Sequence, residues 1–139
     1  MFNISCVTEK NKDFWFSIDK HITKESFDLK IFGKLGYVIY DDRKPVGIMH
    51  HCILWDTMPF LNLIYIDPKY RKCGFGKNAM EFWEKEMKEK GFKLVLISTQ
   101  VDEKAQFFYR KLGYREWGSL VLNDCPLEQP MEMFMGKVL

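Results

Sequence analysis

The segment that decides the fold reads Ile64-Tyr65-Ile66-Asp67-Pro68-Lys69-Tyr70-Arg71-Lys72-Cys73-Gly74-Phe75-Gly76-Lys77. Its apolar start is typical of a strand, its middle is a basic turn, and its two glycines precede the periodic pattern of a helix. Four cations fall within the nine positions 69–77. Glycines let backbone N–H groups converge on one point, and the start of a helix adds unpaired donors and a partial positive charge. The segment therefore predicts a binding site for an anion of pyrophosphate size.

On both sides of this segment, the hydrophobic pattern predicts alternating strands and helices. Strands are expected at 2–7, 36–40, 46–55, 60–66, 93–98, 114–122 and 131–138, and helices at 9–17, 22–32, 76–90 and 102–112. The segment 60–66 is apolar on both faces, which predicts a central, buried strand. This order of elements predicts an α/β fold in which helices pack on a mixed sheet.

Length and composition narrow the class of protein. The 139 residues suit one domain, and 47% hydrophobic with 29% charged residues is typical of a globular protein. A net charge of +2 gives no reason to expect nucleic acid or an anionic membrane as a partner. Aromatic residues make up 16% of the chain, which argues against long disorder.

The cysteines and the N-terminal residues suggest the compartment. Cys6, Cys52, Cys73 and Cys125 form no CxxC pair, so we expect free, reduced thiols in a cytoplasmic protein. Residues 1–5 lack the basic and apolar stretches of a signal peptide, and no apolar run approaches the ~20 residues of a membrane span. His50 and Cys52 share one face of a strand, but no second pair at ligand spacing exists, so no metal is expected.

Two nucleotide-binding motifs resemble the glycine segment without fitting it. Gly74-x-Gly76-x-x-Ala79 matches the dinucleotide fingerprint in form. However, its first glycine lies several polar residues past the strand, and the next strand ends without a ribose-binding acid. The P-loop pattern fails because Asn78 follows Lys77 and because the four-residue gap between glycines is absent. Arg71-x-x-Gly74-x-Gly76 is the pattern that remains.

This pattern resembles the pyrophosphate loop of the GNAT acetyltransferases, which reads Arg/Gln-x-x-Gly-x-Gly/Ala. A second family block reads Asn-x-x-Ala-x-x-Phe-Tyr-x-Lys-x-Gly-Phe/Tyr, and residues 102–114, DEKAQFFYRKLGY, are similar to it. The two blocks occur in the family's order, so the resemblance covers residues 1–139 as a single GNAT domain. It implies a central mixed, mostly antiparallel sheet with helices on both faces.

The resemblance implies acetyl-CoA as co-substrate and a primary amine, on a small molecule or a peptide, as the acceptor that attacks the thioester directly. The residues it assigns to cofactor binding are Ile64, Tyr65, Ile66, Arg71, Lys72, Cys73, Gly74, Phe75, Gly76, Lys77, Asp102, Ala105 and Phe108. Asp102 stands where the family has Asn, and a helix cap is at least as good an interpretation of it. Core packing is expected of Ala105, and this does not exclude a contact with the cofactor. Family members are often dimers, which leaves a homodimer open.

Tyr109 stands where the family places the acid that protonates the leaving thiolate, with core packing as the alternative. The base is harder to assign. Many GNAT enzymes use a Glu on the strand that corresponds to 60–66, and this segment contains no carboxylate. Asp56 is the nearest acid in the sequence, although it also suits a turn, and a water chain would need no single base. His50 and His51 must face opposite sides of a strand, and a structural role is expected for each.

Two further expectations concern function. A catalytically silent acyl-CoA-binding or sensing module is the alternative to an enzyme, because the strand carboxylate is missing. The aromatic residues expected near the thioester predict an apolar acceptor site, and they are Trp55, Phe60, Tyr65, Phe108 and Tyr109.

Overall fold

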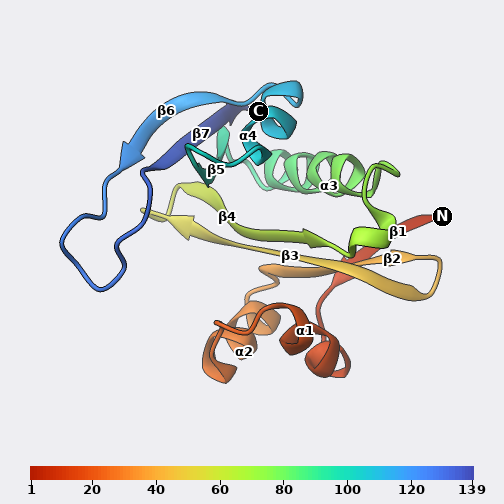
Figure 1. Cartoon of the computed structure of the whole chain (residues 1–139). Helices are drawn as coiled ribbons and strands as arrows, with labels where there is room; N and C mark the ends of the chain where they lie inside the picture. The colour runs from red at the N-terminus through yellow and green to blue at the C-terminus, as the bar shows by residue number, and fades with distance from the viewer. The chain divides into compact units, whose positions relative to one another are not determined.

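The computed structural model describes all residues 1–139 (Figure 1). The strands are β1 (Phe2–Cys6), β2 (Gly36–Asp41), β3 (Lys44–Leu54), β4 (Met58–Ile66), β5 (Leu94–Gln100), β6 (Arg115–Leu120) and β7 (Glu132–Val138). The helices are α1 (Lys12–Ile18), α2 (Lys24–Phe32), α3 (Phe75–Glu89) and α4 (Ala105–Lys111), with short 3-10 turns at Glu9–Asn11 and Pro68–Tyr70. Every predicted element is present, with its ends shifted by a few residues.

The strands form one seven-stranded mixed sheet in the order β1-β2-β3-β4-β5-β7-β6. The pairs β1–β2, β2–β3, β5–β7 and β6–β7 are antiparallel. The pair β4–β5 is parallel, with Phe60 opposite Leu96. The predicted fold class, a mixed and mostly antiparallel sheet with helices, is therefore confirmed. None of the helices is both long and apolar enough to cross a membrane.

The chain divides into two compact units. The strands β3 and β4 and the helix α3 each contribute residues to both units. The first unit contains residues 1–52 and 62–83. One face of its strands is covered by α1 and α2 (Figure 1), and the core there consists of Val7, Trp15, Phe27, Val38 and Ile48.

The opposite face of the same strands packs against α3. Tyr37 and His51 point to this side, where their rings lie 5.8 Å from Phe82 and 5.7 Å from Trp83. Helices therefore cover both faces of this part of the sheet, and the two adjacent histidines of β3 face opposite sides, as the alternation of a strand requires.

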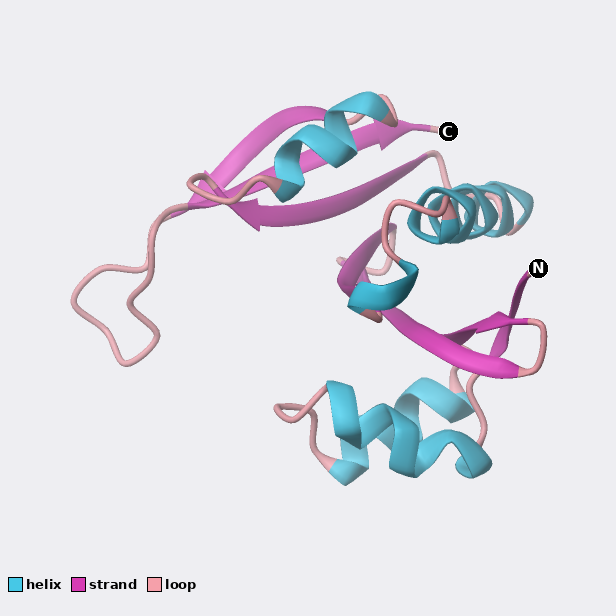
Figure 2. Ribbon diagram, turned by 45° about the vertical axis from the view of Figure 1, so that its right-hand side comes forward, coloured by secondary structure: helices cyan, strands magenta, loops and turns pink.

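The second unit contains residues 53–61 and 84–139. Its strands β5, β7 and β6 carry α4 on one face (Figure 2). Trp117 lies directly over Gly136, where a Cβ atom would come within 2.0 Å of the indole ring. Gly136 therefore has no room for a side chain, and its neighbours Met133 and Met135 supply buried packing.

Local chemistry sets the helix ends. Thr23 caps α2 by accepting a hydrogen bond from the backbone N–H of Ser26, 3.1 Å away. Gly91 and Gly113 follow α3 and α4 with φ of +94° and +97°, a conformation that glycine adopts without a steric penalty. The predicted stops at these two glycines are confirmed.

Two sequence expectations are wrong. Asp102 does not cap α4, because the chain first turns at 101–102, with the N–H of Glu103 donating to the carbonyl of Gln100, and the helix begins only at Ala105. The strand β4 is not fully buried either. Its residue Asn62 is exposed and, with the half-buried Leu63, lines an open pocket.

Candidate active site

The glycine loop, residues 71–77, joins the end of β4 and its short 3-10 turn to α3. Asp67 accepts from the backbone N–H of Lys69 at 2.9 Å, and this turn ends the strand beside Pro68. Lys72 and Gly74 then adopt positive φ values of 61° and 87°. These two left-handed residues reverse the chain direction so that α3 can begin at Phe75.

The first turn of α3 leaves backbone donors available. The carbonyl of Gly74 accepts from the N–H of Asn78 at 3.0 Å, which is the first bond of the helix. The N–H groups of Phe75, Gly76 and Lys77 precede this bond and have no carbonyl to bind within the helix. Lys72 and Lys77 are exposed, and so are Cys73 and Gly74, so the loop is open to an anion from solvent.

Arg71 fixes the loop to the strand. Its Nε donates to the carbonyl of Ile66 at 2.8 Å, and its guanidinium lies 5.2 Å from the centre of the Tyr65 ring. Ile64 and Tyr65 are half-buried and Ile66 is buried. The predicted cofactor residues of β4 and of the glycine loop are therefore neighbours within the first unit.

The remaining predicted cofactor and acid residues belong to the second unit. Tyr109 is buried, with rings of Phe108 and Tyr114 at 5.3 Å and 5.9 Å. Burial, with a smaller contribution from Glu103, raises the pKa of Tyr109 to about 12. Asp102, Ala105 and Phe108 are exposed, so the expected core packing of Ala105 is wrong, because Ala105 is the first residue of a short helix.

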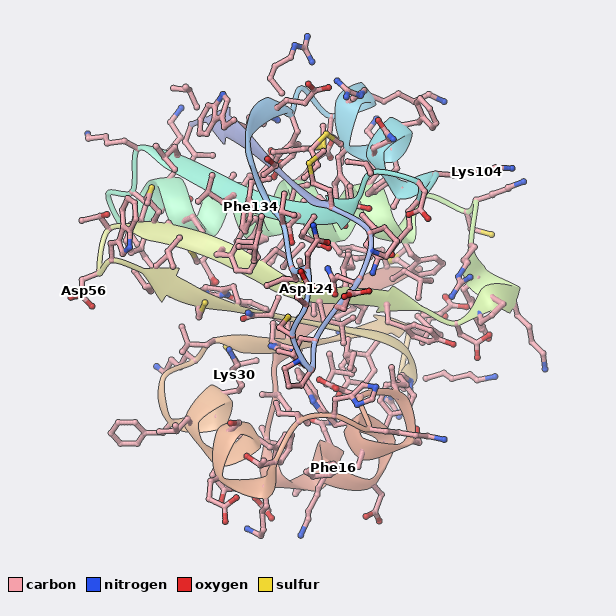
Figure 3. The ribbon with its side chains drawn as sticks, turned by 60° about the vertical axis from the view of Figure 1, so that its left-hand side comes forward. Phe16, Lys30, Asp56, Lys104, Asp124 and Phe134 are labelled. Carbon is pink, nitrogen blue, oxygen red and sulfur yellow. The ribbon has the colours of Figure 1, made fainter.

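Asp56 lies at the tip of the turn between β3 and β4 and points away from the protein (Figure 3). It has a φ of 60° and is exposed, and the turn is closed by the N–H of Thr57, which donates to the carbonyl of Leu54 at 3.1 Å. The turn-forming interpretation of Asp56 is therefore observed. Its role as a base stays a prediction.

A pocket that the sequence did not predict lies in the first unit, with a volume of about 480 Å³. Residues of the α1–α2 connection, of α2, and of β3 and β4 line it, namely Asp19, His21, Ile22, Ser26, Lys30, His50, Cys52, Asn62 and Leu63. Figure 3 shows Lys30 on α2, on the side of the sheet that α1 and α2 cover.

The charged groups of this pocket are paired with neutral ones. His50 Nε2 lies 3.1 Å from an oxygen of Asp19, and both side chains are about nine-tenths buried. Burial first, and then the charge of Lys30, lower the pKa of His50, so the imidazole is neutral at pH 7. Lys30 Nζ donates to the backbone carbonyl of His51 at 2.6 Å and to Asn62 Oδ1 at 3.2 Å, and burial lowers its pKa.

A model of the Acetyltransferase (GNAT) family matches residues 6–114, which is most of the chain. The chain belongs to the GNAT acetyltransferase family. A curated GNAT relative, an uncharacterised acetyltransferase of Streptococcus pyogenes, is 31% identical over 87 residues, or 63% of this chain. These residues are 58% of that relative, so the chain matches little more than half of its length.

Solved structures agree with this GNAT fold over the full length of the chain. An Arabidopsis thaliana protein in complex with the bisubstrate analogue CoA-Ac-MVNAL superposes with a TM-score of 0.84 at 13% identity, over 99% of each chain. The ribosomal-protein-alanine N-acetyltransferase of Brucella melitensis has a TM-score of 0.81 at 15% identity, also over 99% of each chain. At these identities the likeness shows the fold.

Sequence reasoning found the glycine loop of this GNAT chain and missed its polar pocket. Asn62 is the one polar residue in the apolar run 60–66, and His50 and Cys52 share one face of β3. These were usable signals for a polar surface on the strands. Asp19 and Lys30 carried no such signal, because neither lies in a motif. No group of three or more His, Cys, Asp or Glu side chains is arranged to hold a metal ion.

Proposed function

We propose that residues 1–139 form one acetyltransferase domain that transfers the acetyl group of acetyl-CoA to a primary amine. The observation that carries the proposal is the glycine loop, in which left-handed Lys72 and Gly74 precede the free N–H groups at the start of α3. The family match and a structural neighbour in complex with a CoA analogue support acetyl-CoA as the co-substrate.

In this proposal, the pyrophosphate of CoA accepts hydrogen bonds from the backbone of residues 71–77. The exposed Lys72 and Lys77 add positive charge, and the helix N-terminus adds its partial charge. The pantetheine arm pairs with the backbone of residues 64–66. Asp102, Ala105 and Phe108 are proposed contacts from the second block, and all three are exposed.

The reaction joins the amine nitrogen to the thioester carbonyl carbon and then breaks the C–S bond. The attacking amine loses one proton to solvent, and the sulfur leaves as a thiolate that takes a proton from Tyr109. Because the pKa of Tyr109 is about 12, the phenol is protonated at neutral pH and presents an O–H donor. The same pKa makes the resulting phenolate retake a proton from water at once, which resets the residue.

The loop is tested with a matched pair of glycines. Gly74 and Gly91 both have positive φ, and a Cβ atom at either would meet nothing within 4 Å. Gly74→Ala and Gly91→Ala should therefore each destabilise the protein by about 1–2 kcal/mol through backbone strain alone. Only Gly74→Ala should raise the KM for acetyl-CoA, by about tenfold or more. Equal KM values for the two variants would contradict the proposed loop.

The chemistry is tested by thiol release from acetyl-CoA with a panel of amines. Tyr109→Phe should lower kcat by about 10²–10⁴-fold, while Tyr40→Phe, a tyrosine on β2, should leave it unchanged. If CoA binds but no amine accelerates thiol release, and Tyr109→Phe behaves like the parent, the protein is an acyl-CoA-binding module. In that case the enzymatic proposal is wrong.

A further inference from the structure

The pocket lined by Lys30, Asp19 and Asn62 has the size of a small-molecule site. Its volume of about 480 Å³ falls in the range of about 300–1,000 Å³ that such ligands occupy, and it lies wholly within the first unit. Seven of its nine lining residues have polar or ionisable side chains, although apolar atoms form the larger part of its surface. The aromatic-lined acceptor site that the sequence predicted did not include these charged groups.

Lys30 is the group in this pocket whose charge is least compensated. Its ammonium is half-buried and its two acceptors, the carbonyl of His51 and the amide oxygen of Asn62, are neutral. Burial is the largest influence on the Lys30 pKa and lowers it, and the charge of Asp19 opposes this only as a smaller contribution. An ammonium carries three N–H donors, so one remains for a ligand. A half-buried charge of this kind is stabilised by an anion that enters the pocket.

Asp19 provides the opposite charge at another point of the lining. One carboxylate oxygen pairs with His50 Nε2, and the other accepts from the backbone N–H of His21 at 3.3 Å. Both partners are neutral hydrogen-bonding groups, so no cationic side chain is paired with Asp19. The pocket thus contains one cationic and one anionic side chain, and each is hydrogen-bonded to neutral groups. A ligand that carries one negative and one positive group would match both.

The position of the pocket along β4 relates it to the proposed acetyl-CoA site. Asn62 and Leu63 line the pocket, and the residues proposed for the pantetheine arm, 64–66, follow directly. At about 3.3 Å per residue, Asn62 lies about 13 Å from Ile66, where the strand meets the glycine loop. An acceptor in this pocket would stand beyond the end of the arm that carries the thioester.

We propose that this pocket holds the acceptor and that the acceptor is a small zwitterion of the amino-acid type. Its carboxylate binds Lys30, and its amine is positioned beside Asp19. The inference rests on the proposed acetyltransferase function and adds the chemical class of its substrate. A single carboxylate suits the single lysine, since the charge of Asp19 would repel a doubly charged phosphate more strongly.

The test compares amines that differ only in their carboxylate. Thiol release from acetyl-CoA is measured with amino acids, with the amides of the same amino acids, and with the corresponding decarboxylated amines. For the best acceptor, kcat/KM of the acid should exceed that of its amide by about tenfold or more. Amides or simple amines that react as well as the acids would overturn the proposal and leave the acetyltransferase function standing.

Variants then assign this preference to Lys30. Lys30→Met should lower kcat/KM of the acid to about that of the amide without lowering that of the amide, and Lys30→Arg should keep part of the preference. Lys24→Met is the matched control, because Lys24 lies on the same helix with an exposed side chain and should keep the full preference. An acid preference that survives Lys30→Met would overturn the assignment.

Binding is measured separately from turnover. Amino acids should raise the Tm of the parent protein, their amides should not, and Lys30→Met should lose the effect. If no amine releases thiol, the proposed function fails, while this shift in Tm still decides whether the pocket binds a carboxylate. If amino acids leave the parent's Tm unchanged, the pocket proposal fails even when some amine is acetylated.

Discussion

Asp19 and Glu84 are two buried carboxylates with the same exposed fraction, 11% of each side chain, and very different surroundings. Glu84, on α3, accepts from the hydroxyl of Tyr114 at 2.9 Å and pairs with Lys137 Nζ at 2.8 Å. Each of its oxygens has a strong donor, one of them charged. Asp19 instead has a neutral imidazole and a backbone N–H, and it borders a pocket.

The difference separates a carboxylate that holds the fold together from one that is available to a ligand. Glu84 connects α3, the start of β6 and β7. Removing it would leave a buried hydroxyl and an ammonium without their acceptor. Asp19 and Lys30 form hydrogen bonds with neutral groups, and neither is paired directly with an oppositely charged side chain. A fold needs the first arrangement for stability, and a binding site is the setting in which the second is useful.

The largest expected effect concerns Glu84. Glu84→Ala should lower the free energy of unfolding by about 3–5 kcal/mol, because it leaves the Lys137 charge and the Tyr114 hydroxyl without their partner. Urea unfolding followed by circular dichroism measures this. Glu81→Ala on the exposed side of the same helix is the control, and its effect should stay within about 0.5 kcal/mol. A similarly small effect of Glu84→Ala would remove the distinction drawn between the two carboxylates.

The second largest expected effect is a decrease in the free energy of unfolding at alkaline pH, which originates in the second unit. Burial raises the pKa of Tyr109 to about 12, and burial with the Glu84 charge raises the pKa of Tyr114 as well. Above pH 10 the unfolded chain has lost these phenolic protons and the folded chain has kept them, so stability falls as the pH rises. By pH 12 Tyr109 alone should account for about 2–3 kcal/mol.

Urea unfolding between pH 9 and pH 11.5, together with the absorbance of phenolate, checks this expectation. Tyr109→Phe should reduce the alkaline loss, and Tyr40→Phe should not. A free energy of unfolding that stays constant over this range would show that Tyr109 titrates as an ordinary exposed phenol.

The sequence predicted the fold almost completely and the site in part. Hydrophobic periodicity located all strands and helices, and local signals such as Gly91 and Gly113 marked where helices end. The position of β7 between β5 and β6 could not be predicted, because strand order depends on contacts between distant segments. The same holds for the pairing of Tyr114 with Glu84, thirty residues apart.

The geometry of the glycine loop was predictable because it depends on consecutive residues, namely the glycines and the helix start that follows them. The pocket was not predictable, because Asp19, Lys30, His50 and Asn62 come from four separate segments of the chain. At Asp102 the sequence instead predicted a helix cap that the structure does not have. This residue has the chemistry of a cap, but the turn at 101–102 delays the helix by two residues, and a motif cannot reveal that delay.

The smallest expected effect tests Asp19 by removing its charge while keeping its shape. Asp19→Asn retains an oxygen that can accept from His50 Nε2, so the free energy of unfolding at pH 7 should change by only about 1 kcal/mol. Burial and then the Lys30 charge lower the pKa of His50, and Asp19 and Asn62 oppose them. Asp19→Asn removes one opposing group, and the pKa of His50 should therefore fall further.

The sign of the pH effect follows from this shift. Below about pH 6.5 the unfolded chain binds a proton at His50 and the folded chain does not, so stability falls as the pH falls, until the lowered pKa of the folded state is reached. Asp19→Asn should extend this loss to more acidic pH. NMR titration of the imidazoles, with His50→Gln to assign the resonance, measures the pKa directly. An increase in the His50 pKa on Asp19→Asn would mean that Asp19 does not carry the negative charge that the pocket needs to hold an amine.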